Sequence, residues 1–240
     1  MMLQPRVPGV VLAGRRALLA FAVALLTGCA AHVVAPPTTA GAPQGFPTSE
    51  YVRAAAEGRP VYAVDPATSN VVIEVRRAGS LARLGHDHVV AGYDIRGFIR
   101  PDDKRADLYV ALGALVVDES RLREIAEFDT QPSADAIEGT RRNMLGRVLD
   151  AERFPFAVVD VRGLDNQRVA TVSITLHGVT RSMPIPLAVD AEPGEWIVSG
   201  AFRLNQTDFG IVPLSLLGGA IEVQDAIDLR FRIRAVRMPR

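Results

Sequence analysis

AIDLRFRIRA, the run at residues 226–235, alternates apolar and charged side chains over nearly its whole length. Successive side chains of a β-strand point to opposite faces, so Leu229, Phe231 and Ile233 fall on one face and the arginines between them on the other. The pattern predicts an antiparallel strand that buries one face and leaves the other in water.

Similar but less regular apolar rows recur upstream of this run. They are Val71-Ile73-Val75, Tyr93-Ile95 with Ile99, Leu108-Val110-Leu112, Val172-Ile174-Leu176, Ile185-Leu187-Val189, and Trp196-Val198 with Phe202 and Leu204, together with the segments 61–64 and 156–161. Turn-forming pairs such as Pro193-Gly194 separate some of these rows. We expect an all-β fold of about eight or nine strands, a number that suits a closed barrel or a sandwich.

One segment departs from the period of two. From Ser133 to Glu152, apolar residues and Thr140 recur at mostly helical spacing. We expect a short helical insertion that begins near Ser133 and ends before Pro155, because proline cannot continue a helix. A helical turn is also expected at residues 51–57.

The composition is that of a globular protein. Of 240 residues, 48% are hydrophobic and 22% are charged, with 27 basic against 27 acidic side chains. These values exclude collagen-like and wholly disordered chains. The balanced charge offers no basic patch for a phosphate backbone, so we expect no nucleic-acid partner.

The first 28 residues have the features of a secretory signal peptide. Three arginines precede an uncharged apolar run at residues 17–26, which is too short to span a bilayer as a helix. The sequence LTGC at residues 26–29 resembles the lipobox of bacterial lipoproteins, in which the cysteine is acylated and becomes the mature N-terminus. Cys29 is the only cysteine in the chain, so it has no disulfide partner. The alternative is a simple cleaved signal with a coincidental cysteine.

Residues 29–60 are rich in Pro and Ala and should form a tether between the acylated cysteine and a single domain at residues 61–238. The mature chain would carry 24 basic and 27 acidic side chains, a net charge of −3. Acyl chains rather than a basic patch would then hold it at the periplasmic face of the cell envelope. Ala30, rather than an aspartate, follows the cysteine, which favours the outer membrane over the inner.

No catalytic signature is readable. The chain has no G-x-S-x-G, H-E-x-x-H, Walker or G-x-G-x-x-G motif and no cysteine pair. We therefore expect a binding protein rather than an enzyme.

The run LGHDHV at residues 84–89 is the most unusual local feature. His86 and His88 are separated by one residue, so on an extended chain both imidazoles lie on the same side. They could bind a metal with other groups, or serve as hydrogen-bond partners at the mouth of a barrel. For His177, which precedes Gly178, a structural role is expected.

The inward apolar rows leave one question open. A small barrel of about eight strands is either filled by its side chains or holds one ligand, and periodicity alone does not separate these cases.

Four stretches, taken in order, resemble the YceI-like family. They are YAVDPATS at 62–69, NML at 143–145 with FPF at 154–156, TLHGVTR at 175–181, and FRLNQTDFGI at 202–211. The resemblance covers about residues 61–236. It implies an antiparallel, lipocalin-like β-barrel that holds a polyisoprenoid or a similar amphiphile, such as a quinone-like lipid, with no other cofactor.

On this resemblance, we expect one set of ligand-binding residues: His86, His88, Ile95, Phe202 and Phe209. Many family members have a phenylalanine-rich stretch where this chain has Gly85-His86-Asp87-His88, so the ligand of this protein need not be that of its relatives.

Two other functions stay open at this point. One is a metal- or haem-binding module that uses His86 and His88. The other is a filled barrel with an envelope interaction or stress role and no small ligand. A homodimer is a further partner that the sequence leaves open.

The lipobox generates the first testable prediction. Cys29→Ser removes the acylated thiol, so the protein should move from the membrane fraction to the soluble periplasmic fraction, as measured by fractionation and immunoblotting. A wild-type N-terminal peptide whose mass shows no lipid would contradict the lipoprotein assignment.

Overall fold

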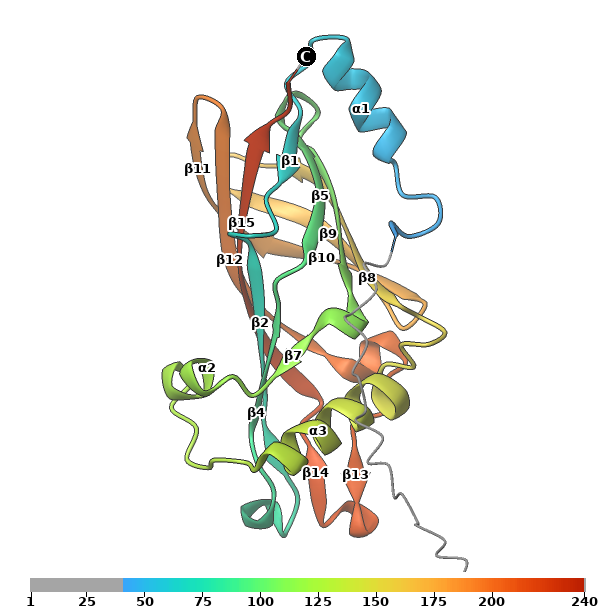
Figure 1. Cartoon of the computed structure of the whole chain (residues 1–240), viewed down its shortest axis with the longest axis vertical. Coiled ribbons are helices and arrows are strands. Elements are labelled where there is room, and N and C mark those ends of the chain that lie inside the picture. The colour runs from blue at the N-terminus through green and yellow to red at the C-terminus, as the bar shows by residue number, and fades with distance from the viewer. Residues whose placement is uncertain (1–40, 240) are drawn as a thin grey trace, which may run out of the picture. The chain divides into compact units, whose positions relative to one another are not determined.

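The computed structural model of the chain describes residues 41–239. Over this range the fold is mostly antiparallel β (Figure 1), with twelve strands in one large sheet and three in a small one. The strands are β1 Tyr62–Val64, β2 Asn70–Val75, β3 Arg77–Ala78, β4 His88–Gly92, β5 Ile95–Arg100, β6 Arg105–Ala111, β7 Val116–Val117, β8 Phe156–Leu164, β9 Val169–Leu176, β10 Val179–Pro186, β11 Ala188–Glu192, β12 Glu195–Asn205, β13 Ser215–Leu216, β14 Ile221–Val223 and β15 Ala226–Arg237.

Strand β15 contains the alternating run at 226–235 and lies inside the large sheet. Along one edge it pairs with β12 from Ala226 to Val236, and along the other it pairs first with β2 and then with β1. Ile233 and Ala235 are buried while Arg232 is exposed. The predicted strand and its two faces are therefore confirmed.

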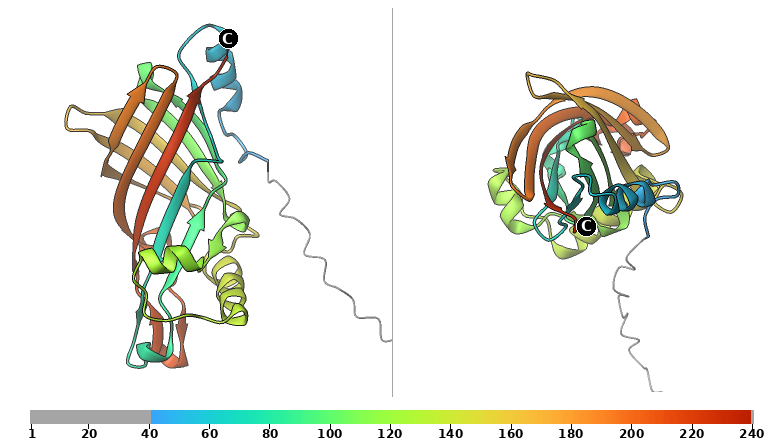
Figure 2. Two further views of the ribbon diagram at one scale, coloured as in Figure 1. Left: turned by 60° about the vertical axis from the view of Figure 1, so that its left-hand side comes forward. Right: turned by 90° about the horizontal axis from the view of Figure 1, so that it is seen from above.

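The two arms of the sheet curve around a common interior (Figure 2). From β15 one arm runs through β1, β5, β6, β8 and β9 to β10, and the other runs through β12 to β11; β4 and β7 extend from β2. The hairpin between β9 and β10 turns at His177 and Gly178, which have φ values of +52° and +76°. Two successive residues with positive φ are typical of a two-residue hairpin turn, so His177 has a structural place in the fold.

The expected closure of the barrel is not observed, because no hydrogen-bonded ladder joins β10 to β12. The N–H of Leu187 donates to the carbonyl of Arg168 on the β9 side, so Pro184 and Pro186 face the edge of β10 that would meet β12. Proline has no N–H to donate and is confined to strand edges. We call this unpaired boundary between β10 and β12 the seam.

The number of strands is also larger than the eight or nine predicted. The chain bends at Leu187, so the row Ile185-Leu187-Val189 supplies both β10 and β11, and β4 forms at 88–92, outside every predicted row. The other additional strands, β3, β7, β13 and β14, have only two or three residues and are too short to show alternation. Three of them form the small sheet in the order β13-β14-β3.

Helices fill the connections. The α-helices are α1 Thr48–Ala56, α2 Ser120–Ile125 and α3 Ala134–Asn143; the 3₁₀ turns are η1 Ala82–Leu84, η2 Pro101–Asp103, η3 Leu112–Ala114, η5 Gln206–Phe209 and η6 Leu217–Gly219; and η4 Met144–Val148 is a π-helical turn. The Ser133 hydroxyl caps α3 by accepting from the N–H of Ala136. The start of the predicted helix at Ser133 is confirmed. None of the helices in residues 41–239 is long and apolar enough to cross a membrane.

Helix α1 packs on the sheet although it lies within the segment predicted to be a tether. Tyr51 is fully buried, stacks on Phe98 with ring centroids 5.0 Å apart, and donates a 2.5 Å hydrogen bond to Asp107. Arg105 also contacts Asp107, at 2.7 Å. Burial of the tyrosine ring and the hydrogen bond of its hydroxyl group can offset the entropy lost when this segment becomes ordered, which proline-rich segments without such contacts cannot do. The packed part of the chain therefore begins before Val61.

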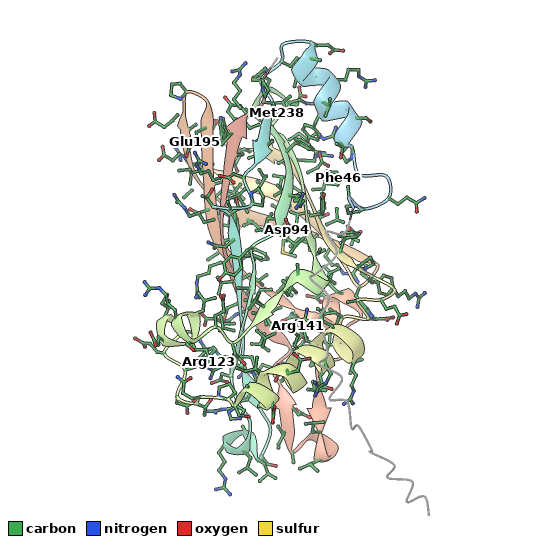
Figure 3. The ribbon with its side chains drawn as sticks, in the orientation of Figure 1. Phe46, Asp94, Arg123, Arg141, Glu195 and Met238 are labelled. Atoms are coloured by element: carbon green, nitrogen blue, oxygen red, sulfur yellow. The ribbon has the colours of Figure 1, made fainter. Side chains whose placement is uncertain are left out.

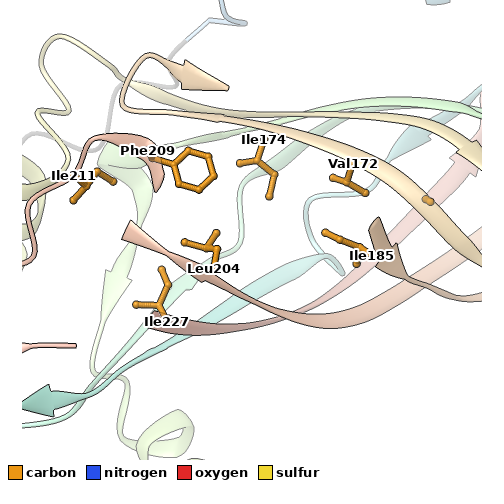
Figure 4. Packing of buried hydrophobic residues seen from close by; sticks show 8 residues of the cluster. Val172, Ile174, Ile185, Leu204, Phe209, Ile211 and Ile227 are labelled. Atoms are coloured by element: carbon orange, nitrogen blue, oxygen red, sulfur yellow. The ribbon is translucent and has the colours of Figure 1, made fainter. Parts of the chain in front are cut away.

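The largest buried cluster lies between β9, β10, β12 and η5. Figure 4 shows its members, which are Ala170, Val172, Ile174, Ile185, Leu204, Phe209, Ile211 and Ile227. These side chains come from both sides of the seam, so apolar packing joins the two edges where backbone hydrogen bonds do not.

The two faces of β15 generate the second prediction. Ile233→Asp places an unpaired carboxylate among buried apolar groups and should cost about 3 kcal/mol or more. For a domain of this size the Tm should fall by roughly 6–12 °C. Arg232→Asp on the exposed face should change the Tm little. Equal melting temperatures for the two variants, measured by circular dichroism, would show that the face assignment is wrong.

Candidate functional site

A cavity of about 560 Å³ lies inside the large sheet. Its wall consists mainly of the inward-facing members of the apolar rows, among them Val71, Leu108, Val159, Val172, Leu229 and Ile233. The volume falls within the range of small-molecule binding sites. The interior is therefore hollow here, which answers the question that periodicity left open.

Helix α3 and the π-helical turn close one side of the cavity. Asn143, Met144 and Val148 line it. Met144 and Leu149 pack against buried residues that follow β6, including Leu112 and Leu115. A π-helical turn in this position is typical of functional sites.

The apolar lining reaches the molecular surface at the end formed by η1 and β13. Leu84 and Leu216 line the cavity and are also 62% and 41% exposed. The small sheet and η1 lie together at this end of the molecule (Figure 1), and the N–H of Leu81 donates to the carbonyl of Ala220 between them. These two side chains thus extend the apolar lining of the cavity to the outside of the molecule.

The histidine pair lies at the same end. His86 and His88 both line the cavity, and their ring centroids are 6.2 Å apart. Asp87, between them, accepts a 2.8 Å hydrogen bond from the backbone N–H of Arg77. Asp87 therefore stabilises the β3 connection while its two neighbours face the interior.

The other three predicted ligand-binding residues separate into two groups. Ile95 and Phe202 line the cavity. Phe209 does not line it: its side chain is fully buried in the cluster of Figure 4, near Ile174 and Leu204. The reason is the 3₁₀ turn η5 after β12, which ends the alternation that placed Phe202 on the inner face.

His88 is held by a buried ionic network. Its Nδ1 lies 2.6 Å from Oδ2 of Asp118, and Oδ1 of Asp118 accepts from the N–H of Val89 at 3.0 Å and from Arg123 at 2.5 Å. The side chains of Asp118 and Arg123 are 0% and 1% exposed. Arg123 also donates to the carbonyls of Asp87 and Thr130. It belongs to α2, where Figure 3 labels it.

The ionisation states follow from these contacts. Burial opposes ionisation of Asp118, but hydrogen bonds from His88, Val89 and Arg123 hold the pKa of its carboxyl below the usual value. Burial, with smaller contributions from His88 and Arg123, lowers the pKa of His86. His86 is therefore neutral at pH 7, and its Nδ1 is buried without a hydrogen-bond partner among the described residues.

Sequence reasoning missed Asp118, Arg123 and Trp196. The first two lie 30 and 35 positions after His88, in segments with no alternation, so no local signal placed them beside it. Trp196 appeared in the apolar row of β12, and its place in the cavity wall is set by the pairing with β15.

The sequence also indicated two other sites, a metal site at the histidine pair and an acylated cysteine. Between residues 41 and 239, no group of three or more His, Cys, Asp or Glu side chains is placed to hold a metal ion. Cys29, the predicted site of acylation, lies outside the described residues.

Three solved structures are similar to this chain, and the first of them has a TM-score above 0.5, which indicates a shared fold. A polyisoprenoid-binding domain from Saccharophagus degradans, implicated in plant cell wall breakdown, superposes with a TM-score of 0.52 at 13% identity, covering 74% of this chain and 98% of that domain. BcnA from Burkholderia cenocepacia gives a TM-score of 0.48 at 13% identity, covering 72% and 99% of the two chains. A YceI protein from Campylobacter jejuni gives 0.41 at 12% identity, covering 63% and 85%.

No curated protein matches the chain in sequence. The model of one protein family, the YceI-like domain, matches residues 62–235. This range spans every strand that lines the cavity and both arms of the curved sheet. The chain belongs to the YceI-like domain family.

Proposed function

We propose that this protein is a periplasmic lipoprotein that binds or carries an apolar amphiphile, such as a polyisoprenoid or a quinone-like lipid, in its cavity. The observation that carries the proposal is the cavity of about 560 Å³, whose wall is mainly aliphatic and aromatic. The polyisoprenoid-binding domain that shares the fold is consistent with such a ligand.

The energetic argument depends on the tail of the ligand. Each CH₂ group moved from water into the cavity contributes about 0.8 kcal/mol. A tail of many such groups is insoluble in an aqueous compartment, so a protein that covers most of its surface is needed to hold it there. Entry along the exposed side chains of Leu84 and Leu216 would keep the tail in apolar contact.

The polar end of the ligand would lie at the histidine pair. His86 and His88 are among the few polar residues of the lining, and specific polar groups in an apolar pocket typically orient the ligand. The role is hydrogen bonding rather than catalysis.

The predicted anchor fits this role. Acylation of Cys29 and a proline-rich tether would keep the protein beside the membrane from which an apolar ligand comes, and we place it at the outer membrane. The same lipid anchor would make the diffusion distance between membrane and cavity short.

Filling the cavity tests the function. Ala157 lines the cavity, and Ala157→Phe should reduce the amount of bound amphiphile at least about tenfold because the new ring occupies the space of the tail. The measurement is mass spectrometry of organic extracts from natively purified protein. Thr171→Phe, on the exposed face of β9, is the matched control and should retain the ligand. An extract of wild-type protein without a stoichiometric lipid would contradict the proposal.

Removing both imidazoles tests the polar end. The double variant His86→Ala, His88→Ala should retain less ligand and still fold, because neither side chain belongs to a core cluster. Loss of the hydrogen bond to Asp118 should cost about 1–3 kcal/mol and lower the Tm by several degrees. Loss of the fold would show that the pair is structural. Retention of the lipid with loss of a stoichiometric metal would favour the metal-binding alternative.

A further inference from the structure

His88 presents one ring edge to Asp118 and the other to the cavity. Nδ1 lies 2.6 Å from the Asp118 carboxylate, and the residue lines the cavity. An ionised carboxylate accepts hydrogen bonds and donates none. Nδ1 must therefore carry the proton, and in the neutral imidazole Nε2 on the opposite edge is a hydrogen-bond acceptor.

Arg123 holds the Asp118 carboxylate in place. Its guanidinium lies 2.5 Å from Oδ1 of Asp118, so the other carboxylate oxygen, Oδ2, stays directed at Nδ1 of His88. Asp118 thus acts as a positioning residue that fixes the tautomer of His88.

The arginine that lines this end of the cavity is occupied. Arg77 lines the cavity, but its guanidinium binds Asp129 at 2.6 Å and the carbonyl of Gly85 at 3.0 Å. Glu222, which also lines this end, adds a negative charge. An anionic phosphate beside the imidazoles would therefore meet a guanidinium that is already paired and an additional carboxylate. Arg83, in η1 at the same end, is exposed and does not line the cavity.

His86 has an unsatisfied group. Its Nδ1 is buried without a partner among residues 41–239, and buried polar atoms usually have one. The 6.2 Å between the two ring centroids suits one small polar group in contact with both imidazoles. A hydroxyl group that lies beside the His86 ring can donate to Nε2 of His88.

From this geometry we infer that the ligand's polar end is an uncharged hydroxyl group that donates a hydrogen bond to His88, as in a long-chain isoprenoid alcohol. The inference rests on the proposed function and specifies its headgroup. It excludes a phosphate ester and an ether as the preferred ligand.

The test compares three ligands that share one tail. Geranylgeraniol donates a hydrogen bond, its methyl ether only accepts, and geranylgeranyl phosphate is charged. Trp196, the only tryptophan of the chain, lines the cavity, so its fluorescence in full-length delipidated protein at pH 8 reports binding of all three. Wild-type protein should bind the alcohol about tenfold more tightly than the ether, the effect of about one hydrogen bond, and more tightly than the phosphate.

Asp118→Asn changes the tautomer. The asparagine amide can donate to Nδ1, so the proton of His88 moves to Nε2, which becomes a donor. The preference for the alcohol over the ether should then disappear or reverse, and ¹⁵N chemical shifts of the imidazole should report the Nε2–H form. Asp228→Asn is the matched control, because Asp228 also accepts from an arginine, Arg203, but on the outer face; it should keep the preference.

The outcomes separate the two proposals. If wild-type protein binds alcohol and ether equally, or the phosphate best, the inference is overturned and the proposed function stands. If it binds none of the three, both are overturned. If Asp118→Asn fails to fold, two other measurements test the inference. His88→Phe must abolish the preference for the alcohol while the ether still binds, and the ¹⁵N chemical shifts of wild-type His88 must show the Nδ1–H form. The opposite result in either measurement overturns the inference.

Discussion

The pairing of β15 with three other strands fixes the inner face of the protein. Its hydrogen bonds to β12 on one edge and to β2 and β1 on the other set the register of both arms of the sheet. A slip of one residue would exchange the two faces of a strand and bring Arg230, Arg232 and Arg234 into the interior. This register therefore determines which side chains line the apolar cavity, Trp196 among them, and which side chains of β2 face inward.

Much of this arrangement could be predicted from sequence because alternation depends only on neighbouring residues. The long strands, the helix after Ser133 and the face of Phe231 and Ile233 follow from it. The short strands do not, since two or three residues show no period. The absence of closure had a readable signal in Met183-Pro184-Ile185-Pro186, where two prolines two positions apart indicate an unpaired strand edge.

The candidate site was only partly accessible to the same reasoning. The spacing of His86 and His88 indicates that they share a side, but their chemistry depends on Asp118 and Arg123, which reach them through the tertiary fold. The interior position of Phe202 follows from alternation, whereas η5 removes Phe209 from the lining. The alternation along β12 ends where η5 begins, and the sequence alone did not show where that turn lies.

The seam between β10 and β12 changes the mechanics of the molecule. The circumference of a fully hydrogen-bonded barrel is fixed by the number of its strands and by the stagger between them. Here one boundary is held by side chains such as Ile185 and Leu204, and adjusting a rotamer costs on the order of 1 kcal/mol, far less than breaking a ladder. The circumference is therefore easier to change than that of a closed barrel, and ligands of different thickness would fit the proposed site without rupture of the sheet. On that proposal, selectivity among ligands would depend on their length and polar end rather than on their width.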